Sequence, residues 1–150
     1  MVRGRIRLPV RALSSRAIAN LDKLCLASSA QIVVSSMWRI DRDVPSILTV
    51  AGFKGQFHPD WRTDTDGPQR SDEIERWLDA HGGPSYIVID DKQDDLASMR
   101  TRLVLTDNYT GLTAADVESG LLVMGGCTAL GFSQGISIAG HCAPRFLPSD

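Results

Sequence analysis

Two pairs of polar residues in this sequence stand directly after short apolar runs. Ser35 and Ser36 follow the run QIVV, and Asp90 and Asp91 follow the run YIVI. Serine hydroxyls donate hydrogen bonds to phosphate, whereas clustered carboxylates attract a hard divalent cation that relieves their mutual repulsion. Arg70, near the start of a predicted helix between the two runs, adds a guanidinium that suits phosphate. Together these residue types are those of a phosphate and Mg²⁺ site.

A simpler interpretation applies to the acidic pair taken alone. Aspartate commonly ends a turn after a strand by bonding to nearby backbone, and a single DD pair fits that role without any metal. The serines and Arg70, which supply complementary phosphate-binding groups, favour the site over the turn.

The segments that must position these residues alternate between helical and strand patterns. The expected helices begin near Ser14 or Ser15, Val44, Ser71 or Asp72, and Thr113, and the expected strands are 31–34, 86–89 and 103–105. Strands that are apolar throughout and separated by helices imply a parallel sheet covered on both faces, with ligands at the carboxyl ends of its strands. The sequence therefore predicts an α/β fold of Rossmann-like, three-layer α/β/α type with a mainly parallel sheet.

A long polar segment, 52–70, separates the second and third predicted helices and is expected to be a loop that is functional or mobile. Within it, His58, Trp61 and Arg62 are candidate substrate contacts, as is Arg39 just before it. Trp61 has the aromatic surface that stacks on a nucleobase. The alternative is that the histidine is an ordinary surface residue and that the arginines neutralise nearby aspartates.

Length and composition indicate one domain. The 150 residues are 43% hydrophobic with a formal charge of −2, which suffices for a single core over 1–150. We divide the chain into a basic arm (1–13), a core (14–124) and a tail (125–150) whose structure the pattern leaves open. The arginines of the arm suit phosphate, but without interleaved aromatic residues a solvated terminus is the simpler interpretation.

The sequence favours a cytoplasmic protein that does not enter a membrane. No window has the 18 or more uninterrupted apolar residues of a membrane span, and the arginines near the N-terminus break any signal-peptide segment. Cys25, Cys127 and Cys142 form no CxxC pair, so we expect small buried hydrophobes and neither disulfides nor a zinc site.

Five motifs in order carry a family resemblance. They are IVVSSMWR (32–39), HPDWRT (58–63), QRSDEIERWL (69–78), YIVIDD (86–91) and RLVLTDNYTGLT (102–113). Over about residues 15–124 the chain resembles the haloacid dehalogenase (HAD) superfamily, and within it the HAD-like domains associated with nucleic-acid repair proteins and phages. The resemblance implies that Ser35 is the phosphate-binding hydroxyl, that Arg70 replaces the basic residue of the third motif, and that Asp90 and Asp91 bind Mg²⁺.

One motif of the superfamily is absent. Its members begin with an apolar strand ending in DxD, which supplies the aspartate nucleophile and the general acid, and no DxD precedes residue 32 here. Three functions follow as hypotheses. The first is a Mg²⁺-dependent phosphatase acting on a phosphorylated small molecule or nucleic-acid end, with a DxD strand upstream. The second is a non-catalytic domain that binds phosphate or nucleic acid, and the third is a protein-interaction domain.

The missing first strand would lie at the centre of the sheet, between the strands that end at Ser35 and Asp90. Leaving two interior edges unpaired costs on the order of 1–3 kcal/mol for each buried group, so either another segment fills the gap or the sheet closes, and we expect another segment to pair there. The candidates are RIRLPV (5–10) and GISIAG (135–140), in this chain or exchanged within a homodimer. GISIAG is the better candidate because it lacks the proline of RIRLPV.

Overall fold

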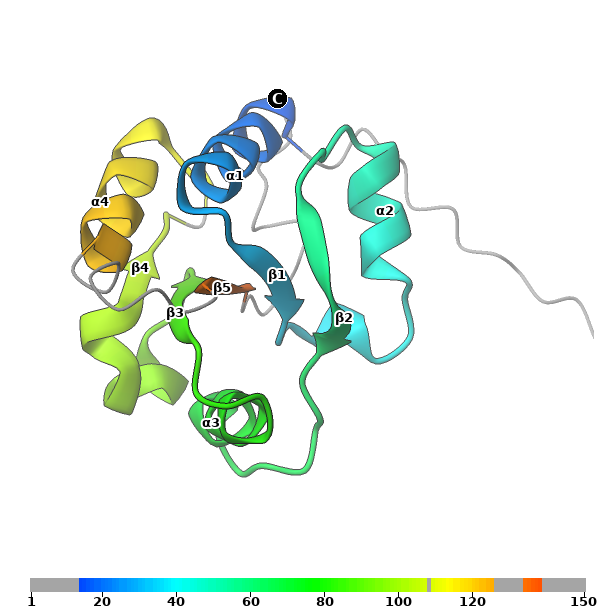
Figure 1. Cartoon of the computed structure of the whole chain (residues 1–150), viewed down its shortest axis with the longest axis vertical. Coiled ribbons are helices and arrows are strands. Elements are labelled where there is room, and N and C mark those ends of the chain that lie inside the picture. Colours follow the sequence, from blue (N-terminus) through cyan, green and yellow to red (C-terminus); the bar gives the residue numbers. More distant parts are fainter. Residues whose placement is uncertain (1–13, 108, 126–133, 139–150) are drawn as a thin grey trace, which may run out of the picture.

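A parallel sheet with helices on both faces forms the core of the computed structural model, which describes residues 14–107, 109–125 and 134–138 (Figure 1). Within these residues the strand order is β2-β1-β5-β3-β4, and all neighbouring strands run parallel. The strands are β1 (Gln31–Val34), β2 (Gln56–Arg62), β3 (Ser85–Asp90), β4 (Leu103–Leu105) and β5 (Gln134–Ile138). The predicted α/β fold with a parallel sheet is confirmed.

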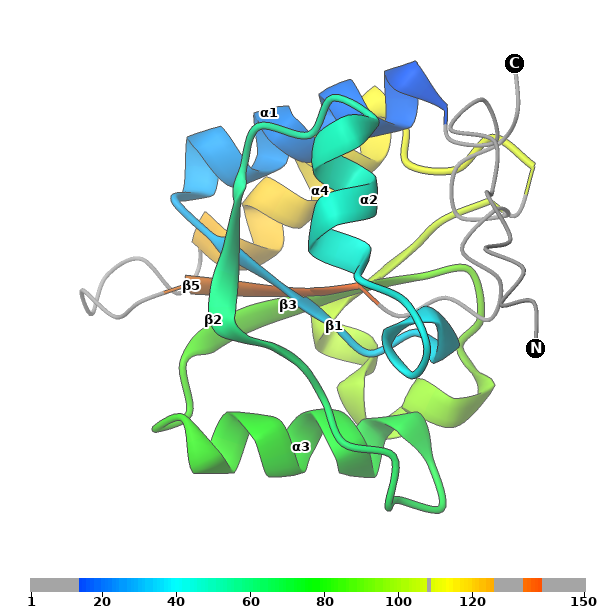
Figure 2. The same ribbon diagram turned by 90° about the vertical axis from the view of Figure 1, so that its right-hand side faces the viewer.

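The helices divide between the two faces, as the side view shows (Figure 2). They are α1 (Ser15–Ser28), α2 (Val44–Val50), α3 (Arg70–Ala80) and α4 (Ala114–Gly125), with 3₁₀ segments η2 (Met37–Arg39) and η3 (Asp94–Arg102). Buried side chains of α1, α2 and α4 share one core with Ile32, Val34, Ile87 and Ile89. Those of α3 and η3 share the other with Val33 and Val88. Alternate residues of β1 and β3 therefore face opposite layers, as in a doubly covered sheet.

Side-chain hydrogen bonds to backbone N–H groups mark the starts of α1 and α4. The Ser14 hydroxyl accepts from the Ala17 N–H at the start of α1. At the start of α4, Thr113 and Asp116 bond reciprocally, because each side chain accepts from the other's backbone N–H. These contacts satisfy N–H groups that have no partner within the helix. None of the described helices is long and apolar enough to span a membrane.

The prediction of an uninterrupted loop over 52–70 is wrong, because this segment contains β2. The strand lies at the edge of the sheet and is largely exposed, so it lacks the continuous apolar pattern of the inner strands. Its pairing with β1 shifts register between Ile32 and Val34, and Pro59 falls in that irregular stretch. Edge strands and bulges tolerate a proline that has no N–H for the ladder.

The centre of the sheet is filled by the C-terminal strand β5. It pairs with β1 on one side, where Val34 aligns with Ile138, and with β3 on the other, where Ile89 aligns with Ile138. The prediction that the GISIAG segment fills the gap is thus confirmed for residues 135–138, and Ala139 and Gly140 lie outside the described residues. Whether the strand can be exchanged within a homodimer stays a prediction. The alternative segment RIRLPV lies outside the described residues, as do Cys127 and Cys142.

Candidate functional site

One edge of the sheet collects polar residues at the points where parallel strands end. Ser35 and Ser36 follow β1, Thr63 follows β2, Asp90 ends β3 and Thr106 follows β4. All five are buried. Because β5 separates β1 from β3, Ser35 and Asp90 stand about 10 Å apart by the usual strand spacing. Because ligands of parallel α/β sheets bind at the carboxyl ends of the strands, these buried polar groups form the candidate site.

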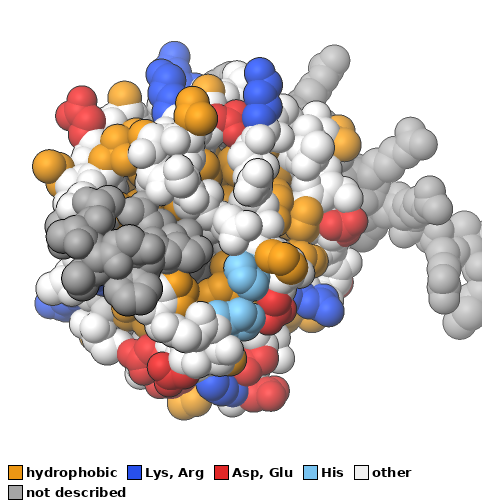
Figure 3. Space-filling view, viewed as in Figure 1, with side chains coloured by type: hydrophobic (Ala, Val, Ile, Leu, Met, Phe, Trp, Pro, Cys, Tyr) orange, Lys and Arg blue, Asp and Glu red, His pale blue; other side chains and the backbone are white. Residues whose placement is uncertain are grey.

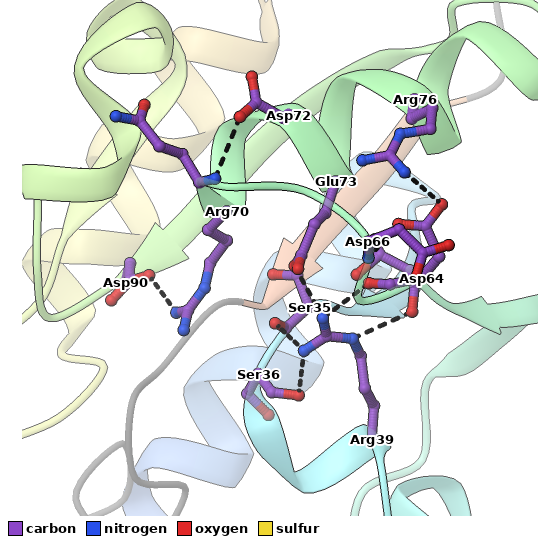
Figure 4. A network of polar contacts seen from close by, with 12 residues as sticks. Ser35, Ser36, Arg39, Asp64, Asp66, Arg70, Asp72, Glu73, Arg76 and Asp90 are labelled. Carbon is purple, nitrogen blue, oxygen red and sulfur yellow. Dashed lines mark hydrogen bonds and ion pairs between the residues drawn. The ribbon is translucent and has the colours of Figure 1, made fainter.

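An ion pair between Arg70 and Asp90 lies at this edge (Figure 4). Nη1 of Arg70 donates to Oδ2 of Asp90 at 3.0 Å, and the two side chains are 8% and 1% exposed. Arg70 is the first residue of α3, so the helix start directs its guanidinium toward the end of β3. Burial raises the pKa of Asp90 to about 7, against the opposing effects of the Lys92 N–H and of Arg70. Asp90 therefore favours its protonated form only below about pH 7, and a further cation at the site would stabilise its charged form.

Asp91 carries an oxygen that suits a metal. Its Oδ1 is buried without a hydrogen-bond partner in the described structure, as is Oγ1 of Thr106, which follows the neighbouring strand β4. An orphaned carboxylate oxygen next to the carboxylate of Asp90 fits the oxygen ligands that Mg²⁺ prefers. No group of three or more His, Cys, Asp or Glu residues suited to a metal occurs among the described residues. If Mg²⁺ binds here, the two aspartates would be its ligands and waters would complete its coordination.

Arg39, a candidate substrate contact, is used internally instead. Its guanidinium donates to the carbonyl oxygens of Ser35, Ser36, Thr63 and Asp64, and to the Glu73 carboxylate. The side chain is 2% exposed. Burial lowers the pKa of Arg39 and raises that of Glu73, and each charge opposes the shift of the other. The geometry leaves Arg39 no N–H to offer a substrate.

The three remaining candidates lie on β2. The His58 ring contacts the rings of Trp77 and His81 edge-on, and the two histidines are visible together on one face of the molecule (Figure 3). The Trp61 ring packs against the main core, and the Arg62 guanidinium lies 5.5 Å from its centre. Arg62 is paired with Val34, the last residue of β1, and therefore lies at the carboxyl edge of the sheet. His58 instead belongs to a surface cluster with α3.

The structure thus gathers Ser35, Ser36, Arg70, Asp90 and Asp91 at one edge of the sheet. Sequence reasoning did not single out Thr63, Thr106 or Glu73 for this site. Thr106 had a usable signal, since it is the first residue after the predicted strand 103–105. Thr63 had none, because it follows β2, which the sequence pattern did not predict. Glu73 had none, because its partner Arg39 lies 34 residues away.

A three-layer α/β domain with hydroxyls after one strand, paired acids after another and a central strand between them is consistent with a HAD-like fold. The chain belongs to the family described as "HAD domain in Swiss Army Knife RNA repair proteins", which matches residues 3–117. Searches of curated proteins and of solved structures gave no match.

Proposed function

We propose that this domain binds a phosphorylated nucleic-acid end, with Mg²⁺, and does not hydrolyse it. The proposed ligands of the phosphate are Ser35, Ser36 and Arg70, and those of the metal are Asp90 and Asp91. The description of the family, which places such HAD domains in RNA repair proteins, makes an RNA end the favoured ligand.

The observation that carries this proposal is the position of β5. It fills the centre of the sheet, where the superfamily has the strand that delivers the DxD aspartates. Its last residue, Ile138, aligns with Val34 and Ile89, each of which immediately precedes a site residue. Strand β5, QGISI, contains no aspartate, so it does not carry the nucleophile that the superfamily has in this strand. This difference supports binding without covalent transfer.

The site residues have complementary tasks in binding. The serine hydroxyls donate to phosphate oxygens, and the Arg70 guanidinium neutralises part of the phosphate charge while it stays paired with Asp90. Mg²⁺, when bound, would supply positive charge to both carboxylates and to the phosphate. Asp90 would then hold its charged form despite its burial.

Hydrolysis is the second candidate function. It is favoured by the retained acid pair, which would be needless for a domain that only contacts protein. Turnover would require an aspartate-bearing strand to replace β5 at the centre of the sheet. A protein-interaction domain, the third hypothesis, predicts no phosphate binding at all.

Calorimetry with matched RNA oligonucleotides tests the proposal. We expect Mg²⁺-dependent binding of an oligonucleotide with a terminal phosphate and at least about tenfold weaker binding of the same oligonucleotide with a terminal hydroxyl. Arg70→Gln should remove the preference for phosphate. Arg76→Gln is the matched control, because Arg76 lies on the same helix in an exposed pair with Asp64.

Phosphate release from the same oligonucleotide is measured in parallel. Release that depends on Mg²⁺ and disappears in Asp90→Asn would favour the phosphatase instead. Equal binding of both oligonucleotides by the wild-type chain would refute phosphate recognition.

A further inference from the structure

Arg39 is a fully desolvated cation beside the candidate site. A guanidinium has five N–H donors, and in Arg39 each of them has an acceptor at 2.5–3.0 Å. Burying a charge is costly unless it is hydrogen-bonded and paired, and this one is both. Because all its N–H donors are bonded within the protein, Arg39 is suited to holding neighbouring segments in place.

The acceptors come from three separate segments (Figure 4). Two are carbonyls that follow β1, two are carbonyls that follow β2, and the fifth is a carboxylate in the first turns of α3: Ser35, Ser36, Thr63, Asp64 and Glu73. The planar fork of arginine can hold several acceptors in fixed directions, which an ammonium group cannot. One side chain therefore fixes the ends of two strands relative to the start of a helix.

The contacts also orient the backbone after β1. The carbonyl oxygens of Ser35 and Ser36 face the guanidinium, with Nη1 at 2.5 and 2.8 Å. Both peptide bonds are trans, so the N–H groups of Ser36 and Met37 point away from Arg39. The two carbonyl oxygens, which would repel a phosphate, thus point toward Arg39. The N–H groups of the same peptide bonds point in the opposite direction.

The ion pair with Glu73 fixes the second half of the site. Nη2 of Arg39 lies 2.7 Å from Oε2 of Glu73, whose side chain is 12% exposed. Glu73 stands three residues after Arg70 on α3, about one helical turn away. The Arg39–Glu73 pair therefore holds the helix start from which Arg70 reaches Asp90.

We propose that Arg39 is a positioning residue of the phosphate site: it holds the turn at Ser35–Met37 and the start of α3 in the arrangement that phosphate requires, without contacting phosphate itself. The inference rests on the phosphate-binding function proposed above.

The test compares Arg39→Lys with the wild type, using inorganic phosphate as the probe in the presence of Mg²⁺. Lysine keeps the positive charge but not the fork, so we expect phosphate affinity to fall at least about tenfold. In wild-type amide NMR spectra, phosphate should shift the signals of Ser36 and Met37, and in Arg39→Lys these two shifts should be lost. Arg76→Lys, the control in an exposed ion pair, should keep affinity within about twofold.

If Arg39→Lys does not unfold cooperatively, Arg39→Ala is measured with and without millimolar methylguanidinium. Restored phosphate affinity supports the positioning role, and no restoration overturns it. Wild-type affinity in Arg39→Lys, with both amide shifts retained, refutes the inference while leaving the proposed function intact. A wild-type chain that binds no phosphate refutes the proposed function, and the positioning role with it.

Discussion

Asp90 is a residue whose pKa the fold raises strongly. Its pKa is raised to about 7 because the side chain is buried, whereas an aspartate in the unfolded chain titrates near 4. The folded state thus binds more protons than the unfolded state between these values. The contribution of Asp90 to stability is fully present below about pH 4 and is lost as the pH rises through 7.

We therefore expect the free energy of unfolding in metal-free buffer to fall between pH 5 and pH 8 through this residue. Asp90→Asn, which cannot ionise, should flatten that dependence and gain stability relative to the wild type as the pH rises. Urea unfolding across this range measures both. A steeper fall in Asp90→Asn than in the wild type would show that another group is responsible.

Magnesium should bind weakly and act through the same two carboxylates. Asp90 and Asp91 provide few protein ligands, and Mg²⁺ retains much of its water. Since the metal favours ionised aspartate, its affinity should increase as the pH rises through 7. Calorimetric titration should show this binding in the wild type and none in the double variant Asp90→Asn with Asp91→Asn. Tight binding that survives both substitutions would place the metal elsewhere.

At the scale of elements, α4 approaches the sheet closely at a single glycine. A Cβ added at Gly120 would lie 3.2 Å from Cδ1 of Ile87 and 3.3 Å from Cδ1 of Leu24. Gly120→Val should therefore destabilise the domain by roughly 1–3 kcal/mol through overpacking. Ser119→Val, the exposed neighbour on the same helix, should change stability by less than about 0.7 kcal/mol. Equal effects in urea unfolding would mean that α4 moves aside without cost.

Elements with a strong local pattern could be predicted from the sequence, and those without one could not. Helix α3 combines an apolar stripe with acidic residues at its start, and β3 is an uninterrupted buried run. The edge strand β2 lacks such a run because water covers much of it. The strand-end residues of the site were predictable from adjacency along the chain. The Arg39 network could not be predicted, because its acceptors after β2 and in α3 lie 24 to 34 residues away along the chain.

At the scale of the whole molecule, the central strand is the last described element of the chain. Every other strand precedes β5, yet β5 pairs with both β1 and β3 and joins the two halves of the sheet. In the described strands no direct β1–β3 pairing exists to replace it. The candidate site also depends on β5, because its serines lie on one side of this strand and its aspartates on the other.

Removing residues 127–150 should therefore abolish cooperative unfolding. The truncated chain would expose two interior edges, and buried unpaired backbone groups cost on the order of 1–3 kcal/mol each, against a typical net stability of roughly 5–15 kcal/mol. A synthetic peptide of residues 127–150, added to the truncated chain, should restore a thermal transition whose midpoint rises with peptide concentration. A peptide with Ile136→Pro and Ile138→Pro is the matched control, because proline removes ladder donors. Light scattering of the intact chain distinguishes the two ways of filling the gap: a monomer mass means that β5 pairs within its own chain, whereas a dimer that survives dilution means strand exchange between copies. A truncated chain with the melting point of the intact one would show that β5 is not what closes the sheet.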